Sequence, residues 1–103
     1  FLGFGREFPE VGRAWEALGE ACAKAGPLDA RTRELVKLAL AVGARLEGAV
    51  HAHTRRPLET GVTQDQSRPV VALAPSTVGF PSAVAAFTWV EDVIASRKKV
   101  GQR

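Results

Sequence analysis

Apolar residues recur along this chain at the spacings of three and four that mark one face of a helix. In the segment from about Pro9 to Ala25, four such positions form a single stripe: Val11, Trp15, Leu18 and Cys22. Proline suits the first turn of a helix, because the N–H that it lacks has no intrahelical acceptor there. We therefore predict an amphipathic helix whose stripe packs against the rest of the protein. Packing of this kind buries the Cys22 thiol and leaves it inert, since a reactive thiol needs an accessible, electropositive setting.

The next segment is almost continuously apolar. Asp29 is a good N-cap for it, and the run Leu35–Val42 is interrupted only by Lys37. A helix that is apolar on all sides is usually buried, so we expect this one to be enclosed nearly all round. Two glycines, Gly43 and Gly48, weaken helical structure and predict a bend or a short break between them.

Helical character continues over residues 47–60, and Gly61 is a natural helix stop. The pattern T-x-x-Q at residues 63–66 is a capping box and announces another helix. Proline inside a helix removes a hydrogen bond and clashes with the preceding turn. We therefore expect kinks or breaks at Pro57 and Pro69.

The remaining chain contains Pro75 near the expected end of that helix and Pro81 at the start of another. The last helix has an apolar face, with two further apolar residues to one side: Val84, Phe87, Val90 and Ile94, flanked by Trp89 and Val93. No segment alternates cleanly with the period of two that is typical of strands. The pattern therefore predicts one all-α domain over residues 1–103.

Composition and charge narrow the classes of function. The chain has 14 Lys and Arg against 11 Asp and Glu, a net charge of +3. Four basic residues lie in a tail at residues 97–103, and without them ten basic residues face eleven acidic ones. The positive charge is thus a property of the tail, so we expect no nucleic-acid partner. No apolar run reaches the roughly 18 residues that span a bilayer, so no membrane partner is expected either.

Further limits come from the termini and the cysteine count. Residues 1–6 lack the pattern of a signal peptide, so we expect a cytoplasmic protein; the chain does not begin with Met, which leaves a lost targeting segment open. One cysteine excludes an intrachain disulfide framework and a zinc site built from several thiolates of one chain. A chain of this length has a thin core, and self-association is therefore a reasonable expectation.

The residues that could carry chemistry gather between Arg31 and Arg56. Glu47 and His51 are four apart and could form an acid–imidazole pair on one helix face. His51 and His53 lie about 200° apart around a helix, so they cannot both bind one metal from a regular helix. No H-E-x-x-H motif is present, and we expect no metal site.

A histidine and a glutamate brought together by packed helices can perform general acid–base catalysis. Arg55 and Arg56 could hold a substrate carboxylate through bidentate contacts. Simpler interpretations remain open at each position. Either histidine could be a surface or hydrogen-bonded core residue, Glu34 a first-turn carboxylate, and the arginines a solvated face.

Three stretches in order resemble the carboxymuconolactone decarboxylase family, whose other main branch is the alkylhydroperoxidase D-like proteins. They are PLDARTRELV at residues 27–36, EGAVHAHTRR followed by LETG at residues 47–61, and TVGFP at residues 77–81. The resemblance covers nearly the whole chain. It implies an alkylhydroperoxidase D-like helical bundle that assembles through helix packing between subunits, as a trimer or hexamer.

The redox branch of this family carries a C-x-x-C pair whose second cysteine precedes a histidine by four residues. With His53 as that histidine, the two cysteine positions fall on Leu46 and Ala49, so both thiols are missing. Glu34 stands nineteen residues before His53, where the proton-relay glutamate of that branch is expected. Thiol peroxidase activity depends on a thiolate and is therefore disfavoured.

The decarboxylase branch uses neither the cysteine pair nor a cofactor or metal, and its reaction requires a proton donor and a cradle for carboxylates. The resemblance implies His53 and Glu34 as catalytic residues, with His51 as a substitute for His53, and Arg31, Arg55 and Arg56 as ligands of a small carboxylated compound. Pro57 departs from the family pattern just after His53. The alternative is a homo-oligomeric structural or ligand-binding module of the same fold without catalysis.

Overall fold

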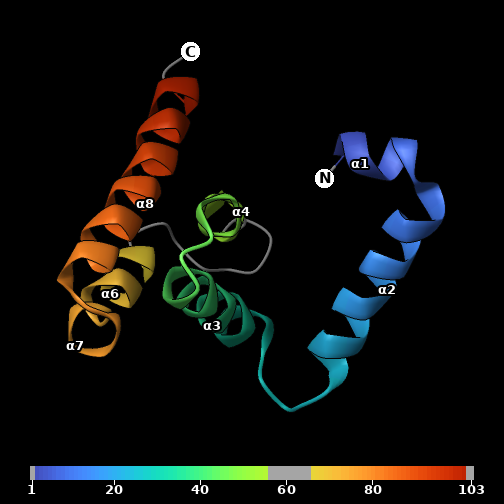
Figure 1. Cartoon of the computed structure of the whole chain (residues 1–103), viewed down its shortest axis with the longest axis horizontal. Coiled ribbons are helices and arrows are strands. Elements are labelled where there is room, and N and C mark those ends of the chain that lie inside the picture. Colours follow the sequence, from blue (N-terminus) through green and yellow to red (C-terminus); the bar gives the residue numbers. More distant parts are fainter. Residues whose placement is uncertain (1, 56–65, 102–103) are drawn as a thin grey trace.

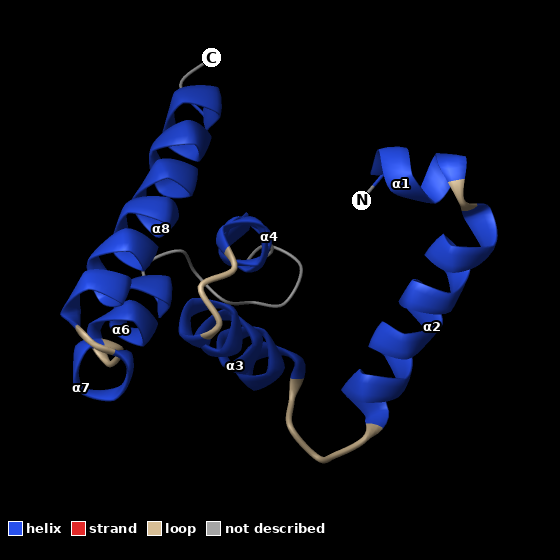
Figure 2. Cartoon of the chain, in the orientation of Figure 1, coloured by secondary structure: helices blue, strands red, loops and turns tan. Residues whose placement is uncertain are grey.

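The computed structural model describes residues 2–55 and 66–101, and within these ranges the chain forms helices joined by turns (Figure 2). In chain order the helices are α1 (Leu2–Glu7), α2 (Pro9–Lys24), α3 (Ala30–Gly43), α4 (Glu47–Arg55), α6 (Ser67–Ala72), α7 (Pro75–Val78) and α8 (Phe80–Gly101). No strand occurs in the described ranges. The prediction of an all-α fold is confirmed.

The helices divide into a packed body and an arm (Figure 1). In the body, α8 packs against α3, α4, α6 and α7, and α3 also packs against α4 and α6. Their facing sides form one hydrophobic core, which consists of Leu38, Ala41, Val42, Val50, Val71, Ala74, Ala83, Ala86, Val90 and Ile94. The arm is the pair α1 and α2, which lies to one side of α3 in Figure 1.

The arm packs on itself through glycine. A Cβ atom added to Gly12 of α2 would lie 3.2 Å from the Cα atom of Gly5 in α1, so a larger residue at position 12 would push the two helices slightly apart. Helix α2 begins at the proline that the sequence indicated, whereas α1 was not predicted. Trp15 is 62% exposed and Cys22 is also exposed. The prediction that Cys22 is packed was wrong, because nothing in the described chain covers the apolar stripe of α2; that its thiol is inert stays a prediction.

Helix α3 begins where its cap predicts. Asp29 takes the extended N-cap conformation, and its Oδ1 atom accepts a hydrogen bond of 2.7 Å from the Thr32 backbone N–H. The expectation that this helix is buried all round was wrong. Leu38 is 1% exposed, but Leu40 is 67% and Val36 is 42% exposed, because the neighbours of α3 leave part of its surface uncovered.

The predicted break between α3 and α4 is confirmed. Helix α3 ends at Gly43, α4 begins at Glu47, and Arg45 between them has a φ of 58°. This left-handed conformation ends one helix and redirects the chain, and it is unusual for a residue with a side chain. The turn brings α4 back against α3.

Four prolines of the described chain lie in the first turn of a helix, whereas Pro27 lies in the segment between α2 and α3. Pro69 is in the first turn of α6, which begins at Ser67, and Pro75 is the first residue of α7. Pro75 therefore opens a new helix, and the expectation that it lies near the end of the preceding helix was wrong. The predicted break at Pro57 and the cap residue Thr63 lie outside the described residues.

Helix α8 begins beside the predicted proline, Pro81, and runs to Gly101, into the basic tail. Its predicted apolar face was only partly correct. Val90 and Ile94 are buried, but Val84 and Phe87 are 47% and 48% exposed. The buried face includes Ala83 and Ala86, since small side chains let α8 approach several helices closely. In the described residues no helix has both the length and the apolarity to cross a membrane.

Truncation of the central core residue should cost much of the folding free energy. Leu38→Ala removes a fully buried side chain and leaves a cavity, so we expect the free energy of unfolding to fall by about 2–5 kcal/mol. Leu40→Ala, on the exposed side of the same helix, is the matched control and should change it by about 0.5 kcal/mol or less. Urea unfolding followed by circular dichroism measures both, and equal losses would contradict the assigned core.

The N-cap of α3 predicts a pH dependence. The hydrogen bond from the Thr32 N–H, followed by that from its hydroxyl, lowers the pKa of the Asp29 carboxyl. A group with a lowered pKa stabilises the folded state above its unfolded pKa and loses that effect as the pH falls through the folded pKa. Wild type should therefore exceed Asp29→Ala in unfolding free energy at neutral pH, and the difference should shrink in acid. A difference that is constant down to pH 2.5 would contradict this role.

Candidate active site

Two acid–base side chains meet between α3 and α4. The Nδ1 atom of His53 lies 2.6 Å from Oε1 of Glu34, across a separation of nineteen residues. The Glu34 side chain is 7% exposed and that of His53 is 20% exposed. The structure therefore joins the glutamate and one of the two histidines singled out from the sequence.

The local fold explains why these two side chains meet. The turn at Arg45 sends α4 back along α3. Val50 and Thr54 of α4 are both fully buried, and the Thr54 hydroxyl donates to the Val50 carbonyl oxygen at 2.7 Å. This buried face fixes the rotation of α4, and His53, the neighbour of Thr54, then points along the side that faces Glu34.

The hydrogen bond assigns different roles to the two ring nitrogens. An ionised carboxylate can only accept a hydrogen bond, so Nδ1 of His53 carries the hydrogen and donates the hydrogen bond to Glu34. The other nitrogen, Nε2, takes no part in this contact, and an arrangement of this kind can support acid–base chemistry there. A carboxylate that holds an imidazole in one tautomer and orientation is the usual support for a histidine acid–base catalyst.

His51 has a different environment. Its Nε2 atom is buried and has no hydrogen-bond partner in the described part of the chain. Glu47 is exposed, and no hydrogen bond between Glu47 and His51 is present among these residues. The pairing considered from the sequence is therefore not formed, and Glu34 and His53 form the acid–imidazole pair.

The arginines differ in their relation to this pair. Arg31 is exposed and lies one turn before Glu34 on α3, so both side chains share a face of that helix. Arg55 is the last residue of α4, two positions after His53, and its side chain leaves the helix about 200° away. Arg56 lies outside the described residues. Of the two predicted carboxylate ligands that the structure describes, Arg31 is the one that shares a helix face with a member of the pair.

The expectations about a pair of thiols and about a metal site also concern this part of the structure. The family positions for paired thiols are occupied by Leu46, which is exposed, and Ala49, which is partly buried. Cys22 lies on α2 in the arm. The described residues contain no group of three or more His, Cys, Asp or Glu that could hold a metal ion.

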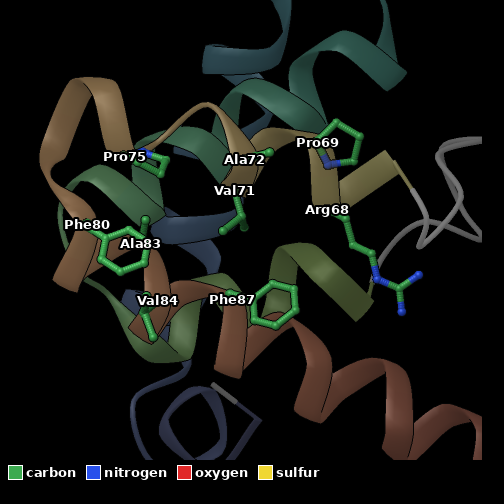
Figure 3. A pocket seen from close by; sticks show the side chains of 9 residues that line it. All are labelled: Arg68, Pro69, Val71, Ala72, Pro75, Phe80, Ala83, Val84 and Phe87. Carbon is green, nitrogen blue, oxygen red and sulfur yellow. The ribbon is translucent and has the colours of Figure 1, made fainter.

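A second feature of the body was missed in the sequence. An open groove of about 690 Å³ is lined by residues of α6, α7 and α8: Arg68, Pro69, Val71, Ala72, Pro75, Phe80, Ala83, Val84 and Phe87 (Figure 3). At its end Arg68 binds Glu91 through two contacts, Nε–Oε1 at 2.7 Å and Nη2–Oε2 at 3.2 Å. Glu34 and His53 are not among the lining residues. The sequence held no signal for this groove, because Val84 and Phe87 carry the pattern of the core face of α8.

Comparison with known proteins places most of the chain in one family. The sequence pattern of the carboxymuconolactone decarboxylase family matches residues 9–92. An uncharacterised protein of Haemophilus influenzae (strain ATCC 51907 / DSM 11121 / KW20 / Rd) is 47% identical over 49 residues, which are 48% of this chain and 43% of that protein. The match thus spans less than half the length of that relative. No solved structure matches this chain.

The contact between Glu34 and His53 should contribute measurably to stability. Glu34→Ala leaves the buried side of the imidazole without its acceptor, so we expect the free energy of unfolding to fall by about 1–3 kcal/mol. A double-mutant cycle with His53→Ala isolates the pair, and a coupling above about 0.5 kcal/mol is expected. Glu47→Ala, which removes an exposed carboxylate on α4, is the control. Additive single changes would show that the two side chains do not interact in solution.

Proposed function

This chain belongs to the carboxymuconolactone decarboxylase family, and from that premise we propose that it performs acid–base chemistry of the lyase type on a small carboxylated compound. The observation that carries the proposal is the 2.6 Å contact between His53 Nδ1 and Glu34 Oε1. The proposed reaction draws on protein side chains alone.

In the proposed reaction, His53 supplies a proton, and Glu34 holds the imidazole ring of His53 in position. The bond between the substrate and its carboxylate breaks, carbon dioxide leaves, and the released electron pair shifts through the adjacent double bond. The carbon at the far end of that system takes the proton from Nε2 of His53. While both ring nitrogens are protonated, the Glu34 carboxylate balances the positive charge of the imidazolium. Nε2 then regains a proton from water.

We assign substrate binding to the cationic side chains that the family resemblance implies. Arg31, which shares a helix face with Glu34, is the first choice for a carboxylate ligand, since a guanidinium binds a carboxylate through two parallel hydrogen bonds. Arg55 and Arg56 complete the proposed set. His51 is the substitute proton donor in this proposal, because its Nε2 atom is buried without a partner in the described chain.

The alternative function is a homo-oligomeric ligand-binding or structural module of the same fold. The exposed apolar surface of the arm and of α8 favours assembly in either case, and we propose a trimer or hexamer as the resemblance implies. Peroxide reduction by thiols ranks third, because Leu46 and Ala49 stand at the positions of the cysteine pair.

Turnover of a carboxymuconolactone, followed by ultraviolet absorbance together with a panel of related small lactones and unsaturated acids, tests the proposal. His53→Ala should lower kcat/KM by about 10²–10⁴-fold, the usual contribution of a positioned acid–base group. Glu34→Gln should lower kcat and change its pH profile with little effect on KM, because this residue acts through His53. Arg31→Ala should raise KM.

Two controls separate this mechanism from its rivals. Cys22→Ser should leave turnover unchanged, whereas a thiol mechanism requires its loss. Glu47→Gln removes the charge of an exposed carboxylate on the helix that carries His53 and should also have no effect. Folded, assembled protein that turns over no member of the panel would favour the non-catalytic module. Turnover that persists in His53→Ala and disappears in His51→Ala would transfer the acid–base role to His51.

A further inference from the structure

The arm exposes a continuous apolar surface, which we call the α2 stripe. Five side chains of α1, α2 and their junction form it, each at least half exposed: Phe4, Phe8, Val11, Trp15 and Leu18. The rings of Phe4 and Phe8 lie against each other with centroids 5.1 Å apart. With about 200 Å² for a fully exposed aromatic side chain, the stripe presents about 500 Å² of apolar area to solvent.

A helix of this kind needs a partner surface. Isolated helices of about 15 residues are marginal in water, and most of their stability in proteins comes from burial of an apolar face. Helix α1 covers only the glycine side of α2, at Gly12. The surface that stabilises α2 must therefore lie beyond the arm.

The groove of the body, which we call the α8 groove, is a surface of the required chemistry. Its most exposed large side chains are Phe80 at 68%, Phe87 at 48% and Val84 at 47%, and they present about 300 Å² of apolar area on the same scale. In Figure 3 the rings of Phe80 and Phe87 flank the groove, while the Arg68 guanidinium extends away from Phe80 and Pro75. The apolar floor is thus left open, with the Arg68–Glu91 ion pair at its rim.

Within one chain the stripe and the groove stay apart. The segment that joins α2 to α3 comprises only residues 25–29 and spans at most about 18 Å when extended. In Figure 1 the helices α3 and α4 lie between α2 and the α6–α8 side of the body. The groove of one chain is therefore positioned for the arm of another.

We infer that the α2 stripe of one copy of this chain packs into the α8 groove of a second copy, with Trp15 as the central anchor. The two surfaces together bury about 800 Å² of apolar area. A stable interface of standard size buries about 1,600 Å², of which somewhat more than half is apolar. Because the two surfaces differ, two copies either exchange arms reciprocally or join head-to-tail, and head-to-tail contacts form a closed ring only where the rotation between copies closes. The inference deepens the assembly part of the proposed function and does not rest on the acid–base chemistry.

Variants on both surfaces test the pairing in the full chain. Trp15→Glu on the stripe and Phe87→Glu in the groove should each weaken association by about 30-fold or more, the effect typical of an interface hot spot. Ala17→Glu on the opposite side of α2 and Ala95→Glu on α8 beyond the groove add the same charge at exposed positions and should leave association unchanged. Sedimentation velocity over a concentration series measures the change, and helicity by circular dichroism checks that each variant folds.

The single cysteine allows the contact to be mapped directly. Cys22 is exposed and lies in line with the α2 stripe at its C-terminal end. A benzophenone attached to this thiol should, on irradiation, cross-link to a second chain within residues 68–87, and digestion with mass spectrometry locates the bond. The same label placed on Ala17→Cys in a Cys22→Ser background is the control and should cross-link weakly.

The outcomes are decisive in either direction. Loss of association in both surface variants, together with cross-links from Cys22 to the groove, supports the inference. Cross-links between two α2 helices, with Phe87→Glu still associated, would show that stripes pair with stripes and would overturn it. A wild-type chain that remains monomeric at all concentrations would also overturn it. Turnover in the assay of the acid–base proposal is scored separately, so failure of one proposal is distinguishable from failure of the other.

Discussion

The close approach of α8 to the other helices of the body is the constraint on which the rest of this structure depends. Ala83 and Ala86 are at most 4% exposed and lie on the face of α8 that meets its neighbours. Small side chains there let α3, α4, α6 and α7 all contact one helix. The same choice excludes the larger apolar residues of α8 from the core, since a helix has a limited circumference. Val84 and Phe87 are therefore left to line an open groove.

The packing of α4 against α8 and α3 also produces the acid–base pair. Val50 and Thr54 are fully buried and set the rotation of α4, which in turn directs His53 toward Glu34. The resulting hydrogen bond holds one nitrogen of the imidazole and leaves the other outside this contact. Burial of Glu34 strengthens this contact, because the low local dielectric makes an unpaired polar group costly. A feature of the core thus fixes the orientation of the group that we propose as proton donor.

The apolar residues of this chain are divided between one core and two exposed surfaces. The body buries enough to hold α3, α4 and α6–α8 together, whereas the arm buries little beyond its glycine contact. A short chain cannot enclose all of its apolar area, because its ratio of surface to volume is high. The stripe and the groove are the apolar area that one chain leaves exposed, and their pairing between copies would bury it. The proposed chemistry and the proposed assembly would then use one scaffold without sharing residues.

The sequence by itself predicted most of the helices and reduced the acid–base pair to Glu34 and one of two histidines. The spacing of apolar residues, the Asp29 cap and the glycines before α4 predicted helix type and several boundaries, since these are local effects of backbone sterics and hydrogen bonding. Resemblance to a family pointed to Glu34 with His53 or His51, and the contact between α3 and α4 selected His53. The tertiary structure alone decided which apolar faces are covered. Cys22, Leu40 and Phe87 all carry the pattern of buried residues, yet they are exposed, because periodicity shows that a helix has an apolar face but not whether another helix lies against it.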